Sequence, residues 1–206
     1  MTNDQNKDYS LAVFVFDGKD TAKEALKKVR ELKKEKTFTL EDVVATYKNE
    51  KGKVKLVQGR NLTGRKGAVG FGVAGLVVGT LLGGPLVGAA VGAAVGSAGS
   101  QIKKVFGNDD LKNLSTELDK DSSALFLLVS DAKEGAFDAL AEEFGGKVYA
   151  FMIESDGITA MGKITEDDAF LAVLEEELVY VDLDDEGEDD DTVEGATETT
   201  EENKGV

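Results

Sequence analysis

The chain has 206 residues, 40 of them acidic and 24 basic, and it contains no His, Cys or Trp. This length suits one domain with attachments, and the net charge of −16 opposes nucleic-acid binding, which needs a cationic surface. Without His and Cys, the sequence excludes disulfides, Cys/His zinc sites and His-based catalytic triads. We therefore expect no enzyme and no catalytic, cofactor-binding or metal-binding residue, and we identify no small-molecule substrate.

The chain begins with signals for a buried strand followed by an amphipathic helix. Residues 11–16 (LAVFVF) form a short apolar run that ends at Asp17-Gly18, as buried strands do. Thr21 to Glu24 fits a capping box, after which apolar residues recur at helical spacing up to about Lys36. The polar N-terminus does not resemble a secretory signal, so we expect the globular part to stay in the cytoplasm.

A hairpin is predicted next. Residues 42–48 and 53–58 are strand-like, and residues 49–52 (NEKG) supply the turn between them.

The segment between Lys66 and Lys103 differs from the rest of the chain because it carries no charge and is rich in glycine. Small residues recur every fourth position, which places them in rows along a helix face. Glycine weakens a helix, so such rows make sense where another backbone packs closely, as between helices in membranes. We assign helix packing or oligomerisation to Gly75, Gly79, Gly83, Gly84, Gly88, Gly92, Gly96 and Ser100.

Residues 60–104 are predicted to form a glycine-zipper helical hairpin that inserts into a membrane. The turn falls at Gly83, Gly84 and Pro85, which separates helices at about 66–82 and 85–102. Each helix is about 25 Å long at 1.5 Å per residue, against about 30 Å for the hydrocarbon core. Basic residues flank both ends and favour a cytoplasmic position for both: Arg60, Arg65, Lys66, Lys103 and Lys104. The alternative is a soluble homo-oligomer in which these hairpins pack in the shared core.

The second half repeats the strand and helix signals of the first. A short helix is expected at 109–120, a buried strand at 124–129, and a helix at 133–144 that Gly145-Gly146 stops. A strand at 147–153 and a helix at 169–180 complete this half. Residues 182–206 form an acidic tail that we expect to be disordered.

Two short stretches align without gaps and indicate an internal repeat. VFDGKDTAKEAL (15–26) matches VSDAKEGAFDAL (129–140), each at the exit of a strand and the entry of a helix. Two such units predict an α+β fold of the ferredoxin-like, split β-α-β type, built from residues 9–58 and 109–180. Asp17 and Asp131 are interpreted as acids that favour helix entry; a paired carboxylate site is the alternative.

Motifs typical of ligand sites occur in contexts that do not support them. The G-x-G-x-x-G match at 70–75 lacks both a preceding strand and an acid about 20 residues later. The calcium-loop match that starts at Asp182 has Val193 where a bidentate Glu is required.

The chain resembles a bacterial family of predicted membrane proteins called domain of unknown function 1269. The resemblance covers about residues 9–155 and rests on the LAVFVFD opening, LEDVVATYKNEKGKVKLVQGRNLTG (40–64), GGPLVGAAVGAAVG (83–96) and SSALFLLVSDA (122–132). It implies membrane association, no known activity and a loose link to stress response, and it supplies no catalytic residues.

These observations lead to two hypotheses of function. In the first, a non-enzymatic protein of the cytoplasmic membrane contacts lipid and self-associates through its glycine hairpin, while the α+β domain serves as a cytoplasmic interaction module. In the second, the protein is a soluble, cytoplasmic homo-oligomeric scaffold.

Overall fold

The computed structural model describes an α+β protein with one six-stranded sheet. The described residues are 8–48, 54–58, 73–82, 113–114, 116–118, 121–133, 135–165 and 179–182. The strands are β1 (Tyr9–Asp17), β2 (Thr39–Lys48), β3 (Val54–Gln58), β4 (Ser122–Ser130), β5 (Lys147–Ile153) and β6 (Val179–Asp182). The helices are α1 (Thr21–Lys34), α2 (Val73–Leu82), α6 (Asp138–Phe144) and α7 (Ser155–Ile164).

The sheet has the order β5-β1-β4-β2-β3-β6. Its first five strands are antiparallel to their neighbours, and β6 joins β3 in parallel. The central strands β1 and β4 are buried along almost their whole length, because both faces of the sheet are covered. This explains why their sequences are continuous apolar runs and do not alternate.

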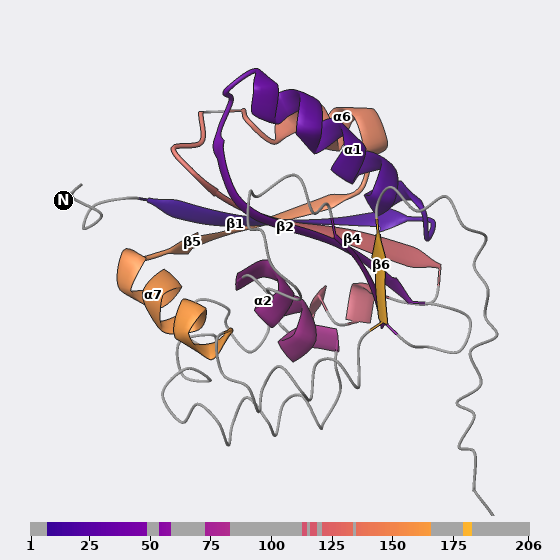
Figure 1. The fold of residues 1–206 in the computed structure, drawn as a ribbon. Coiled ribbons are helices and arrows are strands. Elements are labelled where there is room, and N and C mark those ends of the chain that lie inside the picture. The colour runs from indigo at the N-terminus through magenta and orange to yellow at the C-terminus, as the bar shows by residue number, and fades with distance from the viewer. Residues whose placement is uncertain are drawn as a thin grey trace, which may run out of the picture.

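Helices cover the two faces in separate pairs (Figure 1). On one side, α1 and α6 pack over a core that contains Phe14, Leu125, Leu127 and Leu140. On the other side, α2 and α7 pack over a second core that contains Val13 and Phe126. We call these the α1 face and the α2 face. Alternate residues of each central strand point to opposite faces, so one strand contributes to both cores.

Most predicted elements of the first half are confirmed. The strand expected at 11–16 is β1, the helix is α1, and the hairpin strands are β2 and β3, paired as predicted.

The predicted capping box is wrong. Asp20 is the N-cap and makes no side-chain cap bond, while the Thr21 hydroxyl donates backward to the carbonyl of Asp17 at 2.7 Å. The helix N-terminus is instead satisfied from β4, where the Ser123 hydroxyl accepts from the Ala22 amide at 3.0 Å and donates to the Gly18 carbonyl at 2.6 Å. A distant, fully buried serine on β4 therefore supplies an acceptor at this helix N-terminus.

The second half contains four corrections. Helix α6 begins at Asp138 and not near 133, because Gly135 has φ +73° and cannot lie in a right-handed helix. Helix α7 was not predicted, since Gly157 and Gly162 weaken its propensity. Of the helix expected at 169–180, residues 169–178 lie outside the described residues, and Val179 and Tyr180 belong to β6. The expected tail boundary at 182 also shifts, since Asp182 is the last residue of that strand.

Asp17 and Asp131 do not form a paired site. Strands β1 and β4 are antiparallel, and their register places Asp17 opposite Ser122 while Ser130 lies opposite Tyr9. The two acids therefore follow opposite ends of the sheet, roughly 27 Å apart at about 3.4 Å per residue. Asp131 also adopts a left-handed backbone, φ +52°, which Asp tolerates better than most residues.

Candidate functional site

The first part of the glycine-rich segment lies inside the domain, on the α2 face of the sheet. The apolar side chains of α2 from Val73 to Val78 are at most 7% exposed, and Gly75 and Gly79 are buried as well. Helix α2 packs on β2 and β4 and lies beside α7. A helix that is apolar all round is stable when it is enclosed on all sides, and this is the environment that the described part of α2 has.

A carboxylate from the sheet holds the N-terminus of α2. The Asp42 Oδ2 atom accepts a 2.9 Å hydrogen bond from the Ala74 amide, and Oδ1 accepts one of 2.9 Å from the Val43 amide. The first amides of a helix lack internal partners and carry partial positive charge, so an acidic acceptor there stabilises the helix.

A β-bulge aims Asp42 at this helix. The register with β4 shifts between Leu40 and Asp42, which leaves Glu41 as the extra residue. The shift lets Leu40 keep its place in the α1-face core while Asp42 lies opposite Leu128, which belongs to the α2-face core. Bulges commonly re-aim a side chain in this way. The extra residue is also anchored, since Glu41 Oε1 accepts a 2.6 Å bond from the Ser130 hydroxyl.

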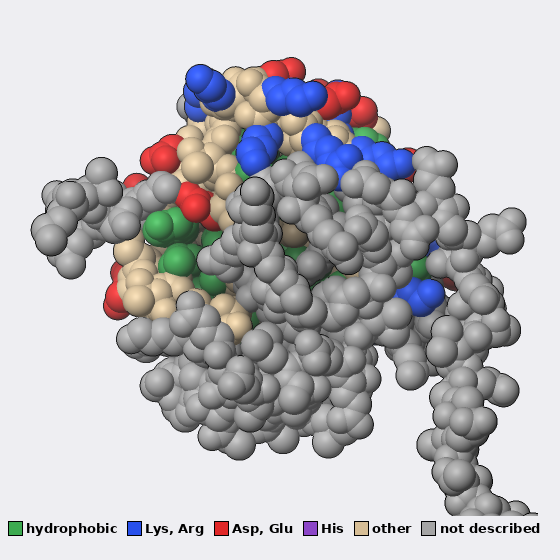
Figure 2. Space-filling view, viewed as in Figure 1, with side chains coloured by type: hydrophobic (Ala, Val, Ile, Leu, Met, Phe, Trp, Pro, Cys, Tyr) green, Lys and Arg blue, Asp and Glu red, His purple; other side chains and the backbone are tan. Residues whose placement is uncertain are grey.

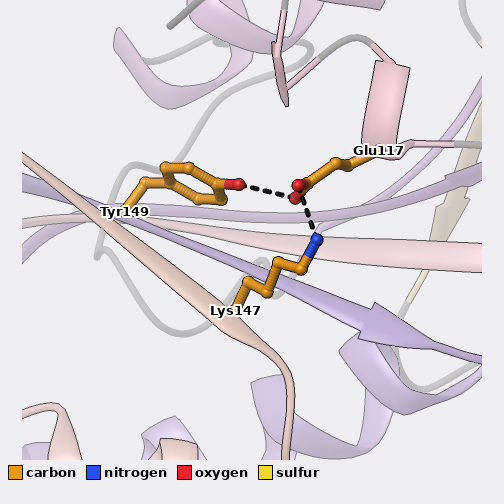
Figure 3. Close-up of polar contacts among 3 residues, drawn as sticks. All are labelled: Glu117, Lys147 and Tyr149. Carbon is orange, nitrogen blue, oxygen red and sulfur yellow. Dashed lines mark hydrogen bonds and ion pairs between the residues drawn. The ribbon is translucent and has the colours of Figure 1, made fainter.

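A second polar contact joins the far end of the insert, which we define as residues 59–121, to the edge strand β5 (Figure 3). Glu117 accepts from the Tyr149 hydroxyl at 2.6 Å through Oε2 and from the Lys147 ammonium at 2.7 Å through Oε1. Lys147 and Tyr149 are two residues apart on β5, so they point to the same face. The neighbouring Leu114 and Leu118 are buried in the α2-face core.

The three side chains shift one another's protonation in consistent directions. Hydrogen bonds from Lys147 and then Tyr149 hold the pKa of Glu117 below its usual range, against a smaller opposing effect of burial. The hydrogen bond to Glu117 raises the pKa of Lys147, and that of Tyr149 is raised by the same acceptor and by burial. At neutral pH the cluster is therefore an ionised carboxylate held by two protonated donors.

The arrangement is suited to holding the insert on the sheet. Asp42 of β2 accepts a hydrogen bond from the first described helix of the insert. Lys147 and Tyr149 of β5 donate hydrogen bonds to Glu117, which lies near the end of the insert. Both donors of the Glu117 cluster are committed to that carboxylate. Within the described residues, no group of three or more acidic side chains is placed to hold a metal ion.

The predicted helix-packing residues are only partly within the described structure. Gly75 and Gly79 lie in α2 and are buried within the monomer. The other predicted positions lie outside the described residues: Gly83, Gly84, Pro85, Gly88, Gly92, Gly96, Ser100, Arg60, Arg65, Lys66, Lys103 and Lys104.

The structure does not support the transmembrane prediction for residues 66–82. In the described part of this range the helix has ten residues, Val73–Leu82, which is about 15 Å at 1.5 Å per residue. No described helix combines the length and apolar character needed for a bilayer crossing. The apolar side chains that suggested lipid contact are those that build the α2-face core.

Sequence reasoning missed the polar residues that secure the insert. An acidic pair at the start of an otherwise apolar strand, Glu41-Asp42, was an available signal for a bulge. Glu117 offered none, because its partners on β5 lie 30 and 32 positions away in the chain.

The fold and these contacts define an α+β protein that packs an apolar inserted helix on its own sheet, of which five strands are antiparallel. Residues 68–165 match the family model described as "Protein of unknown function (DUF1269)". This confirms the resemblance noted from the sequence, although the match begins in the insert and extends through α7. No curated protein and no solved structure matches the chain.

Proposed function

We propose that this protein is a non-enzymatic association module: a ferredoxin-like split β-α-β domain that binds the first helix of its insert and self-associates through the remaining glycine row, Gly83 to Ser100. The ferredoxin-like assignment is supported by two β-α-β units, β1-α1-β2 and β4-α6-β5, interleaved in the order β5-β1-β4-β2. The protein would act in the cytoplasm through its own copies and without a cofactor.

The observation that carries the proposal is the burial of α2. A helix enclosed from Val73 to Gly79 and held by Asp42 is a structural part of the domain. Its glycines are therefore used for close packing within one chain. The remaining row, Gly83 to Ser100, has the same four-residue spacing, which is typical of close packing between helices.

Membrane association is the second candidate. It is favoured by the composition of α2, which carries no charged residue and is apolar on all sides. In this case the insert would leave the sheet and enter lipid, with the flanking basic residues and the α+β domain on the cytoplasmic side. The link to stress response that the family resemblance implies is compatible with either candidate.

One experiment separates these candidates. The mass of the full chain would be measured by light scattering after size exclusion, and its binding to anionic phospholipid vesicles by flotation. Gly88→Leu, Gly92→Leu and Gly96→Leu are combined in one variant. The matched control is the Ala90→Leu, Ala94→Leu and Ala98→Leu variant, which has the same spacing but lies on the opposite helix face.

We expect an oligomer that does not float with vesicles, and a lower mass for the glycine variant than for the alanine control. A parent protein that is monomeric at all concentrations would contradict self-association. Flotation of the parent chain, with retention by vesicles at alkaline pH, would replace the proposal with membrane association.

A further inference from the structure

The edge strand β5 carries the large apolar side chains that are exposed on the described surface. These are Val148 and Met152, 40% and 68% exposed, and Ala150 between them is exposed too. All three lie on the α1 face, in register with residues of β1. Helices α1 and α6 cover β1 and its other neighbours on this face but leave β5 open. Figure 2 shows apolar atoms at the surface on the side of the molecule where β5 and α7 lie.

The outer backbone edge of β5 carries no other strand among those that the structure describes. The strand is last in the sheet, and among the described strands only β1 pairs with it. Natural edge strands are usually protected by charge, proline or irregularity. Strand β5 has seven residues in regular pairing, no proline and one charged side chain, Lys147, whose ammonium is bound to Glu117. Its sequence therefore does not discourage the addition of another strand.

The sequence of β5 is complementary to itself in the antiparallel direction. If Ala150 lies opposite Ala150 of a second copy, Val148 faces the second copy's Met152, and Tyr149 faces its Phe151. Val148 and Met152 form an apolar row on the α1 face, and Tyr149 and Phe151 form an aromatic pair on the α2 face. Cross-strand pairs of these kinds stabilise antiparallel sheets.

Charges at the two ends of the strand favour the same orientation. Lys147 begins β5, and the exposed Glu154 follows its last residue. Antiparallel pairing brings the lysine end of each copy to the glutamate end of the other, whereas parallel pairing would place like charges together.

We propose that a second copy of this chain binds along β5, antiparallel and centred on Ala150, so that the two sheets join into one. This interface is distinct from the glycine row, and it depends on no residue of that row. In this interface the second copy covers the exposed apolar side chains of β5 and also pairs with its outer backbone edge.

Disulfide trapping tests the register directly, because the chain has no native cysteine. In Ala150→Cys the two copies would place Cα atoms about 4.5–5.5 Å apart across the pairing axis, within the range that a disulfide spans. We expect a covalent dimer under mild oxidation that reduction reverses. The control is Thr159→Cys on α7, another exposed neutral position. A yield for Ala150→Cys no greater than for Thr159→Cys would overturn the proposal.

A second variant tests the interface without a crosslink. Val148→Lys combined with Met152→Lys changes two exposed side chains, so the fold should persist by circular dichroism. We expect the mass in solution to fall at least twofold and Ala150→Cys trapping to be lost in this background. An unchanged mass would overturn the proposal.

Failure of this proposal is distinguishable from failure of the glycine-row proposal. The Gly88, Gly92 and Gly96 variant should still be trapped through Ala150→Cys if β5 pairing is correct. Trapping that disappears in that variant would show that β5 contacts are secondary to the glycine row and would contradict an independent interface.

Discussion

The hydroxyl of Tyr149 donates a 2.6 Å hydrogen bond to Glu117, which lies 32 positions earlier in the chain. This contact joins the end of the insert to the edge strand of the sheet, and the Asp42 carboxylate joins the start of the insert to β2. Two acids that are distant in sequence thus fix one apolar segment against one face. Their energetic roles can be measured separately.

Asp42→Asn should destabilise the protein by about 1–3 kcal/mol, because an amide has one acceptor oxygen where the carboxylate uses two. Either the Val43 or the Ala74 amide would lose its partner. Urea unfolding measures the loss, and hydrogen exchange at Ala74 locates it. The control is Asp20→Asn, since Asp20 makes no side-chain cap bond. An equal effect of the two substitutions would contradict the assigned role.

Glu117→Gln should make stability less dependent on pH in the acid range. The pKa of Glu117 is lowered from 4.5 in the folded protein, so its contribution is complete above that value and is lost as the pH falls through the lowered pKa. The variant should lose about 0.5–1 kcal/mol at pH 7, a modest value because the side chain is partly exposed, and the difference should shrink below pH 4.5.

Unfolding by urea between pH 3 and 8 checks this, with Glu143→Gln as the control, because Glu143 pairs with Lys28 on an exposed surface. A difference between the parent chain and Glu117→Gln that stays constant over this range would contradict an ionised Glu117. At alkaline pH, the contribution of this cluster to stability changes with pH in the opposite direction. The raised pKa values of Lys147 and Tyr149 mean that their contribution is complete below pH 10 and is lost as the pH rises beyond it.

Ser123→Ala should cost about 1–3 kcal/mol, because it leaves the buried Ala22 amide and the Gly18 carbonyl without the serine hydroxyl. The measurement is the free energy of unfolding in urea. Ser10→Ala is the control, since that hydroxyl donates only to the weak sulfur acceptor of Met152 at an exposed position. If both substitutions have effects below about 0.5 kcal/mol, α1 does not depend on β4 for its N-terminus.

Gly162→Ala should stabilise the protein by about 0.5–1 kcal/mol, because alanine favours the helix and a Cβ there meets no atom within 4 Å. Gly157→Ala in the same helix is the matched comparison. Its Cβ would lie 3.3 Å from Ile153 Cγ2, so the gain should be smaller or negative. Thermal unfolding should show a rise of about 1–4 °C for Gly162→Ala. A larger rise for Gly157→Ala would mean that α7 packs less closely on β5.

Local sequence patterns were reliable where one periodicity dominated. Residues 147–153 were predicted as a strand and are β5, and the apolar spacing from Ala22 to Leu32 produced α1. Predictions failed where the deciding group was distant. The Thr21 capping box competed with a hydroxyl from β4, and α7 forms despite two glycines because Met161 is buried beneath it in the α2-face core.

The apolar composition of α2 was correctly recognised, but the environment of this helix was not. A helix that is apolar on all sides avoids water equally well whether lipid or protein surrounds it. Sequence hydropathy therefore could not distinguish a bilayer from the open face of a sheet for Val73 to Leu82. The bulge at Asp42 distinguishes the two environments, because it directs a carboxylate of the folded sheet at the N-terminus of α2.

The sequence alone determined the α+β class and the similarity of residues 68–165 to the DUF1269 family model, because these depend on the local order of apolar runs, helical spacing and turns. Only the tertiary structure decided which face receives α2, that Asp17 and Asp131 lie apart, and that Glu117 meets β5. Those relationships depend on strand order and register, which bring together residues that no local pattern connects.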